Sequence, residues 1–288
     1  MGPAKLKDYY YLTKPGIIYA NVITAIAGYL FGSKWDINFV ALLGVVVGTG
    51  LVIAGSCTYN NVLDRHIDKK MKRTKNRALV TGSISVPAAL TYATVLFLGG
   101  LITLVLTTNL SVVAVGLIGF IDYVFIYGWA KRHTSWSTVI GSISGSTSIL
   151  AGYVTATGTL NGASGWLLFL ILALWQMPHF YSIAMYRRKD YQAIGVPLMP
   201  LLKSEATAKL RVMLYIAAFA TSTALLTVLG AGGMTSLVIL LGLSIAWFIK
   251  GIQNYSLPSK DWGKKMFLFS LIVNLGISLA VAIGSVAP

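Results

Sequence analysis

The chain has 288 residues, of which 56% are hydrophobic and only 11% charged, and its formal net charge is +15. This composition excludes an ordinary water-soluble domain and is typical of a bundle of membrane helices. The single cysteine, Cys57, excludes an internal disulfide. We therefore predict an all-α, polytopic membrane protein that forms a single domain over residues 1–288.

Apolar runs close to the ~20 residues that cross a hydrocarbon core predict nine transmembrane helices. In chain order, the runs are Pro15 to Phe31, Phe39 to Tyr59, Val86 to Leu106, Ser111 to Gly128, Ser137 to Thr157, Gly165 to Tyr186, Leu210 to Leu229, Gly233 to Ile249 and Met266 to Val286. The second and sixth runs each lead into a long charged loop. This weak repeat predicts two four-helix halves plus a ninth helix, with the charged loops brought together over one cavity.

Lysine and arginine gather in alternate loops. They precede the first run and follow the second, fourth, sixth and eighth, whereas the loops around Thr107 to Leu110, Gly158 to Ser164 and Gly230 to Gly232 carry no charge. Because cytoplasmic loops carry the excess of Lys and Arg, we predict a cytoplasmic N-terminus. The basic residues border membrane helices and serve topology first, so membrane lipid is an expected partner and nucleic acid is not.

The second apolar run ends in three polar residues spaced by four, Asn60, Asp64 and Asp68. Residues four apart share one helix face, so the amide and both carboxylates can converge on one ligand. Such oxygens suit Mg²⁺, which takes one or two carboxylates together with phosphate oxygens and water. This pattern predicts a metal-bridged, lipid-linked diphosphate. A solvated helix end, with its acids paired to nearby basic residues, is the alternative.

Four basic residues are candidates to bind the diphosphate. Arg73 and Arg77 follow the acidic face and are again four residues apart, and Lys131 with Arg132 follows the fourth run. Arginine forks onto phosphate oxygens as a leaving diphosphate gains charge. Each of the four also lies where the positive-inside rule expects a basic residue. The alternative therefore stays open that they only fix the orientation of the helices in the membrane.

Polar residues inside the sixth run mark a second candidate region. Gln176 and His179 flank Pro178, which predicts a kink, and Tyr181 follows. Polar side chains within a membrane helix usually face the bundle interior or a cavity, although a lone histidine is also often a hydrogen-bonded core residue. We predict that Gln176, His179 and Tyr181 line a cavity. Asp122, near the middle of the fourth run, stays unassigned.

The stretch from Asn60 to Asp68 resembles the first aspartate-rich motif of the UbiA superfamily of intramembrane prenyltransferases. Three further stretches, Arg73 to Arg77, Trp175 to Phe180 and Lys189 to Ala193, resemble its branch of protohaem IX farnesyltransferases. The similarity covers essentially the whole chain. There are two departures. Arg187 stands where the second motif usually begins with aspartate, and Ser146 to Tyr153 lacks a usual Pro-Pro pair.

The resemblance implies farnesyl diphosphate and haem B as substrates, haem O and diphosphate as products, and Mg²⁺ as cofactor. Carried over residue by residue, it implies catalytic roles for Asn60, Asp64, Asp68 and His179, and metal binding by Asp64, Asp68 and Asp190. It also implies a prokaryotic cytoplasmic membrane with the active site facing the cytoplasm. A later haem-modifying enzyme or a terminal oxidase is a candidate partner. The alternatives are a prenyltransferase for a quinone precursor or lipid alcohol, and a membrane transporter.

Overall fold

Nine helices in the described part of the chain are long and apolar enough to cross a membrane, as the sequence predicts. A computed structural model describes residues 5–284 and shows helices and no strand over that range. The spanning helices are α2 (Pro15–Ser33), α3 (Phe39–Asp68), α5 (Val86–Thr107), the continuous stretch Leu110–His133, α8 (Ser137–Thr157), α9 (Ala163–Tyr186), α12 (Glu205–Val228), α13 (Met234–Gln253) and α14 (Ser259–Ile283). The all-α membrane fold is therefore confirmed.

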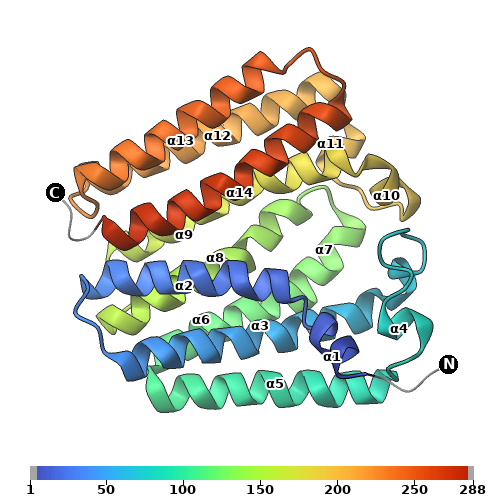
Figure 1. The fold of residues 1–288 in the computed structure, drawn as a ribbon, viewed down its shortest axis with the longest axis horizontal. Coiled ribbons are helices and arrows are strands. Elements are labelled where there is room, and N and C mark those ends of the chain that lie inside the picture. Colours follow the sequence, from blue (N-terminus) through green and yellow to red (C-terminus); the bar gives the residue numbers. More distant parts are fainter. Residues whose placement is uncertain (1–4, 285–288) are drawn as a thin grey trace.

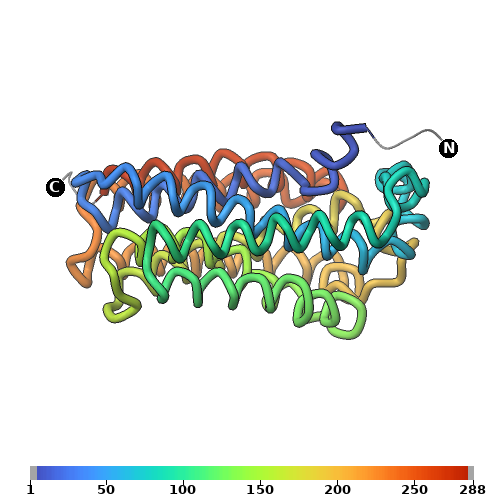
Figure 2. Tube along the Cα trace, turned by 90° about the horizontal axis from the view of Figure 1, so that it is seen from below, coloured from blue at the N-terminus to red at the C-terminus, as the bar shows by residue number. Residues whose placement is uncertain are grey.

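Four short helices gather at one end of the bundle (Figure 1). They are α1 (Leu6–Leu12), α4 (Ala78–Thr81), α10 (Arg188–Ala193) and α11 (Met199–Leu202). The chain enters the bundle at this end, through α1, and α14 ends at the opposite end after an odd number of crossings (Figures 1 and 2). The loops rich in Lys and Arg, between α3 and α5 and between α9 and α12, thus lie together. That this end faces the cytoplasm stays a prediction.

The helices close into a bundle because the first and last spanning helices meet. Helix α2 packs against α3, α8 and α14, and α9 packs against α8, α12 and α14. One apolar core joins α9, α12, α13 and α14 around Trp247 and Trp262, and another joins α2, α3, α5 and α8 around Tyr29 and Leu104. Moving such a side chain from water into the core is worth about 1.5–3 kcal/mol. In a membrane the side chain leaves lipid and not water, so the stabilisation comes from close packing between the helices.

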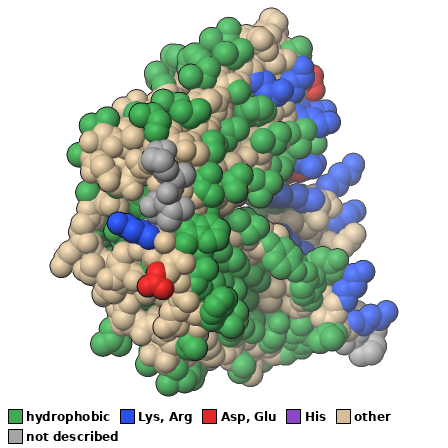
Figure 3. Space-filling model, turned by 60° about the vertical axis from the view of Figure 1, so that its left-hand side comes forward, with side chains coloured by type: hydrophobic (Ala, Val, Ile, Leu, Met, Phe, Trp, Pro, Cys, Tyr) green, Lys and Arg blue, Asp and Glu red, His purple; other side chains and the backbone are tan. Residues whose placement is uncertain are grey.

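The outer surface of the bundle is apolar and its charge is confined to the ends. Large hydrophobic side chains such as Leu106, Leu110 and Val238 are exposed by more than half, as lipid-facing residues of a membrane helix should be. In Figure 3 hydrophobic side chains cover much of the visible face, and most of the visible Lys and Arg side chains gather along one edge. The composition and this distribution make the chain an integral membrane protein.

The fourth spanning helix changes its hydrogen-bond pattern midway. Helix α6 (Leu110–Ile121) passes into one turn of π-helix, η1 (Asp122–Ile126), and then into α7 (Tyr127–His133). A π-turn inserts an extra residue and rotates every side chain that follows it, and such turns occur often at functional sites. The sequence carried no sign of this turn. Helix α9 runs through Pro178 without interruption, so the kink expected there stays a prediction.

Candidate active site

The second spanning helix continues as a regular helix through the acidic pattern, which confirms that the three polar residues share a face. Helix α3 ends at Asp68, with Asn60 and Asp68 buried and Asp64 half-buried. Asn38 caps its start, because the side chain accepts a hydrogen bond from the backbone N–H of Ala41. Asn60, Asp64 and Asp68 therefore lie in a line that runs from membrane depth to the basic end of the bundle.

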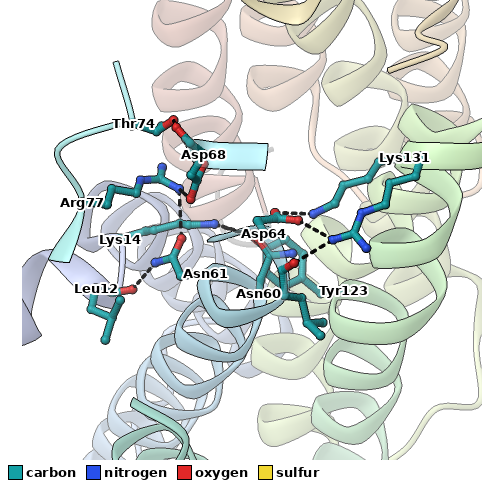
Figure 4. Close-up of polar contacts among 12 residues, drawn as sticks. Leu12, Lys14, Asn60, Asn61, Asp64, Asp68, Thr74, Arg77, Tyr123 and Lys131 are labelled. Atoms are coloured by element: carbon teal, nitrogen blue, oxygen red, sulfur yellow. Dashed lines mark hydrogen bonds and ion pairs between the residues drawn. The ribbon is translucent and has the colours of Figure 1, made fainter. Parts of the chain in front are cut away.

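Asp64 lies between two cations of α7. Lys131 Nζ pairs with Asp64 Oδ2, while Arg132 Nη2 is 3.0 Å from Oδ1 and also donates to the carbonyl of Leu63 at 2.9 Å (Figure 4). The side chains of Asp64 and Lys131 are only 15% and 12% exposed. The structure thus brings together three of the predicted site residues, from α3 and the end of the fourth spanning helix.

Asp68 is held by the loop that follows α3. Arg77 Nη1 lies 2.7 Å from Asp68 Oδ2 and 3.0 Å from Asn61 Oδ1, and the hydroxyl of Thr74 donates to the Asp68 carbonyl at 2.9 Å (Figure 4). Asn61 in turn donates to the carbonyl of Leu12 at 2.7 Å. These contacts fold the basic loop back over the end of α3 and place Arg77 at the site.

Lys14 is a site residue that the sequence reasoning missed, having been counted only as a topology signal. Its Nζ donates to Asn60 Oδ1 at 2.9 Å and lies 3.4 Å from the hydroxyl of Tyr123. Lys14 has a left-handed backbone conformation, with φ of 55°, which is costly for a side chain with a Cβ and collects at functional sites. The signal available in the sequence was a lysine directly before Pro15, at the start of a membrane helix.

The π-turn and the first residue of α7 supply the aromatic wall of the site. Tyr123 and Tyr127 stack with ring centres 5.8 Å apart, and the ammonium groups of Lys14 and Lys131 lie 5.8 Å and 5.5 Å from the centres of the Tyr123 and Tyr127 rings, respectively. Asp122, which the sequence left unassigned, accepts a hydrogen bond from the backbone N–H of Ser144 at 3.0 Å and so fixes the turn against α8. The electron-rich faces of the two rings attract the ammonium groups of Lys14 and Lys131 and so hold these cations beside Asn60 and Asp64.

The two charged loops meet, as the repeat predicts. The guanidinium of Arg73 lies 5.9 Å from the ring centre of Tyr191 on α10. Asp190, on the first turn of α10, is half-buried, but it is not drawn into a metal cluster with Asp64 and Asp68. Within residues 5–284 no three His, Cys, Asp or Glu side chains converge in this way. Metal binding by Asp190 therefore stays a prediction.

The structure separates the three predicted cavity residues of α9. His179 Nδ1 contacts Ser270 Oγ of α14 at 2.6 Å, and its ring stacks on Trp175. Gln176 is buried and its amide donates to the Ser142 carbonyl and the Ser146 hydroxyl of α8, at 3.1 and 2.9 Å. Gln176 is thus committed to helix packing. Tyr181 lies two residues beyond His179, about 200° around the helix, and contacts the ring of Tyr215 instead.

The oxygen donors present fit Mg²⁺ bound together with a diphosphate. Asp64 and Asp68 offer two carboxylates one helix turn apart, which is the number that Mg²⁺ usually takes from a protein when phosphate oxygens complete its coordination. Buried Asn60 Nδ2 has no hydrogen-bond partner, although Lys14 occupies the Oδ1 atom of the same amide. An unpaired buried donor beside several cations points to an anionic ligand.

We expect the pH profile to report Lys14. Burial lowers the pKa of Lys14 to about 8. The positive charges of Arg77 and Lys131 lower this pKa further, and the negative charge of Asp64 raises it. Its ammonium is present below that pH and lost above it. If Lys14 contacts the diphosphate, kcat/KM for the prenyl diphosphate should fall about tenfold per pH unit above the pKa. Steady-state rates between pH 7 and 9.5 measure this.

Lys14→Arg is the matched variant, because arginine keeps its charge throughout that range. It should abolish the alkaline fall, and Lys14→Met should lower kcat/KM at pH 7 without an inflection near 8. An alkaline limb unchanged in Lys14→Arg would contradict the assignment.

Comparison with known proteins agrees with the fold and with the family that the sequence motifs indicate. The model of the UbiA prenyltransferase family matches residues 21–273. A protoheme IX farnesyltransferase of Pectobacterium carotovorum is 39% identical over 286 residues, covering 98% of this chain and 96% of the relative. One from Salmonella arizonae is 40% identical over 284 residues, with the same coverage of both chains. The branch indicated by the stretches Arg73 to Arg77, Trp175 to Phe180 and Lys189 to Ala193 is the one that these relatives bear in their names.

Solved structures support the fold alone, because their sequences are distant. A digeranylgeranylglyceryl phosphate synthase superimposes with a TM-score of 0.80 at 20% identity, over 98% of both chains. A UbiA homologue from Archaeoglobus fulgidus, bound to GPP and Mg²⁺, has a TM-score of 0.71 at 16% identity, over 96% of this chain and 99% of the other. With the family model matching most of its length and relatives close to 40% identical throughout, the chain belongs to the UbiA prenyltransferase family.

Proposed function

We propose that this protein transfers the farnesyl group of farnesyl diphosphate to a vinyl group of haem B, with addition of water, to give haem O and diphosphate. The observation that carries the proposal is the unpaired amide donor of Asn60 among Lys14, Asp64 and Lys131 at the basic end of the bundle. The names of the relatives supply the acceptor. The reaction fits a site that can hold a diphosphate at the membrane surface and its lipid tail among apolar helices.

The basic residues stabilise the leaving diphosphate. In the structure Lys131 and Arg132 pair with Asp64, and Arg77 pairs with Asp68. The two carboxylates thus neutralise the same cations that would bind a diphosphate. When bound at Asp64 and Asp68, Mg²⁺ would supply a Lewis acid for the phosphate oxygens. Lys14, Arg77, Lys131 and the Asn60 amide would then donate to the negative charge that grows as the allylic carbon–oxygen bond breaks.

The tautomer of His179 follows from its hydrogen bonds. The Ser270 hydroxyl donates to the Phe267 carbonyl at 2.5 Å, so its oxygen accepts from Nδ1–H of His179. The other ring nitrogen, Nε2, therefore carries a free lone pair. We propose that Nε2 either orients the water or contacts the haem. The vinyl group attacks the allylic carbon, positive charge develops on the carbon next to the porphyrin, and water adds there with loss of a proton.

Three alternative functions are compatible with part of this evidence. A quinone precursor or a lipid alcohol could take the prenyl group at the same diphosphate site, and the structural neighbour named digeranylgeranylglyceryl phosphate synthase has the same fold. A membrane transporter is the third alternative, because transporters are often built from internal repeats like the one seen here. Transporters, however, place their polar site near the bilayer midplane. Here Asp64 and Asp68 lie at the end of α3, next to the basic loops. That position favours chemistry on a head group at the membrane surface.

One assay separates these functions. The purified protein is incubated with haem B, farnesyl diphosphate and Mg²⁺, and the extracted pigments are analysed by mass. We expect a haem heavier by one farnesyl group and one hydroxyl group, with one diphosphate released per haem consumed. Release of diphosphate only in the presence of a quinone precursor or lipid alcohol would assign the alternative acceptor. No prenylated product with any acceptor would favour transport.

The position of the enzyme in the cell is part of the same proposal. We place it in a prokaryotic cytoplasmic membrane with the basic end, and hence the active site, facing the cytoplasm. Haem O would leave the site as an apolar porphyrin, so a later haem-modifying enzyme or a terminal oxidase is the expected recipient.

A further inference from the structure

A pocket opens on the side of α9 that faces away from His179. It has a volume of about 250 Å³ and is lined by Trp136, Tyr181, Met199, Lys203, Arg211 and Tyr215, among others. These residues come from the start of α8, from α9, α11 and α12, and none of them contacts the acidic face of α3. The pocket is therefore separate from the diphosphate site.

The cations of this pocket have no acidic partner. Lys203 and Arg211 are both exposed, and the ion pairs within residues 5–284 involve only Asp64 and Asp68 as acids. Glu205, the acid nearest to Lys203 in sequence, forms no ion pair with it. Two unpaired cations beside the phenols of Tyr181 and Tyr215 form a set of donors that matches a phosphate group.

The depth of the pocket favours a lipid phosphate over a soluble one. Tyr181 lies five residues from the end of α9, and Arg211 six residues from the start of α12. At 1.5 Å per residue, both lie about 7–9 Å inside the helix ends. The head-group region of a bilayer is about 5–8 Å thick on each side. Trp136 is 63% exposed beside the pocket, in the position that tryptophan takes at membrane interfaces.

The volume also limits the ligand. Pockets that enclose drug-sized molecules measure roughly 300–1,000 Å³, and a porphyrin needs a space within or above that range. At about 250 Å³ the pocket suits a phosphate with a small polar group, while the exposed Leu202 at its rim offers a surface for an acyl chain. Haem bound through its propionates is therefore a poor fit.

We infer that this pocket binds the head group of an anionic phospholipid, with Lys203 and Arg211 on the phosphate and Trp136 against the glycerol region. The lipid would fill the groove between α8 and α12 at the basic end of the bundle and fasten α11 to it. This inference does not depend on the acceptor or on the reaction proposed above.

Native mass spectrometry of the detergent-purified protein tests the inference. The probes are phosphatidylglycerol, phosphatidylcholine with the same acyl chains, and inorganic phosphate. We expect one tightly retained phosphatidylglycerol and weaker retention of phosphatidylcholine. Because each basic residue near a membrane surface adds a comparable electrostatic contribution, the double variant Lys203→Gln/Arg211→Gln should bind phosphatidylglycerol about 30-fold more weakly.

Lys260→Gln is the matched control, because Lys260 is exposed on the first turn of α14 at the same end of the bundle but outside the pocket. It should retain phosphatidylglycerol as the wild type does. Trp136→Ala keeps both charges and should lower retention of either phospholipid. Equal binding by wild type and the double variant would overturn the inference. So would binding of inorganic phosphate that competes with the lipid at millimolar concentration, since the pocket would then be a soluble-anion site.

Discussion

Asp64→Asn should lower haem O formation by about three orders of magnitude, a loss of about 4 kcal/mol of transition-state stabilisation. Asp64 is both the carboxylate proposed for Mg²⁺ and the partner of Lys131 and Arg132. Asparagine has nearly the same shape and keeps one oxygen for those cations, so the fold should survive while the metal loses a charged ligand. Pigment extraction over a Mg²⁺ titration measures the loss, which excess metal should restore only in part.

Asp36→Asn is the control for this variant. Asp36 is exposed and lies between α2 and α3, at the end of α3 opposite to Asp64, so its loss should leave turnover unchanged. The thermal unfolding of both purified variants should match that of the wild type. Wild-type turnover by a folded Asp64→Asn protein would remove Asp64 from the site.

His179→Asn should lower haem O formation at least about 100-fold, within the range expected for loss of a proton-transferring or orienting group. The shorter amide can still donate to Ser270 Oγ in place of Nδ1–H, but it has no atom where Nε2 stands. Binding of farnesyl diphosphate, measured by equilibrium dialysis, should be retained because His179 contacts α14 and not the acidic face of α3.

Two further variants separate chemistry from packing at this position. Ser270→Ala removes the partner of Nδ1 but keeps Nε2, so it should cost less activity than His179→Asn. His179→Gln places a polar atom nearer to Nε2 and should restore part of the rate. If His179→Asn turned over haem normally, His179 would be a packing residue between Trp175 and Phe267.

The features of the fold that could be predicted are those that depend on a single segment of the chain. Each spanning helix must satisfy its own backbone and cover a fixed apolar thickness, so runs such as Val86 to Leu106 predict their helices almost to the residue. The face of Asn60, Asp64 and Asp68 follows from the helical repeat in the same way. At Gly145 the structure shows why a residue without a side chain fits, because a Cβ there would overlap the Gln176 carboxamide.

Some of the site could not be predicted because it depends on contacts between distant segments. Lys14 reaches Asn60 from 46 residues away, and Tyr123 of the π-turn contacts the same lysine from 109 residues away. No local pattern marks such a turn. The separation of His179 from Tyr181, by contrast, was available from their spacing of two residues, which places them on opposite sides of a helix.

The sequence by itself determined the class of this protein, the nine spanning helices within residues 5–284 and the helix face of Asn60, Asp64 and Asp68. Hydrophobic thickness and the helical repeat act within one segment, so these features need no distant contact. Only the tertiary structure decided how that face is used. It brought Lys14 to Asn60, Arg77 to Asp68 and Lys131 to Asp64. It also committed Gln176 to the contact with α8 and separated Tyr181 from His179. Charges and amides at membrane depth must find partners, and those partners come from whichever helices pack alongside.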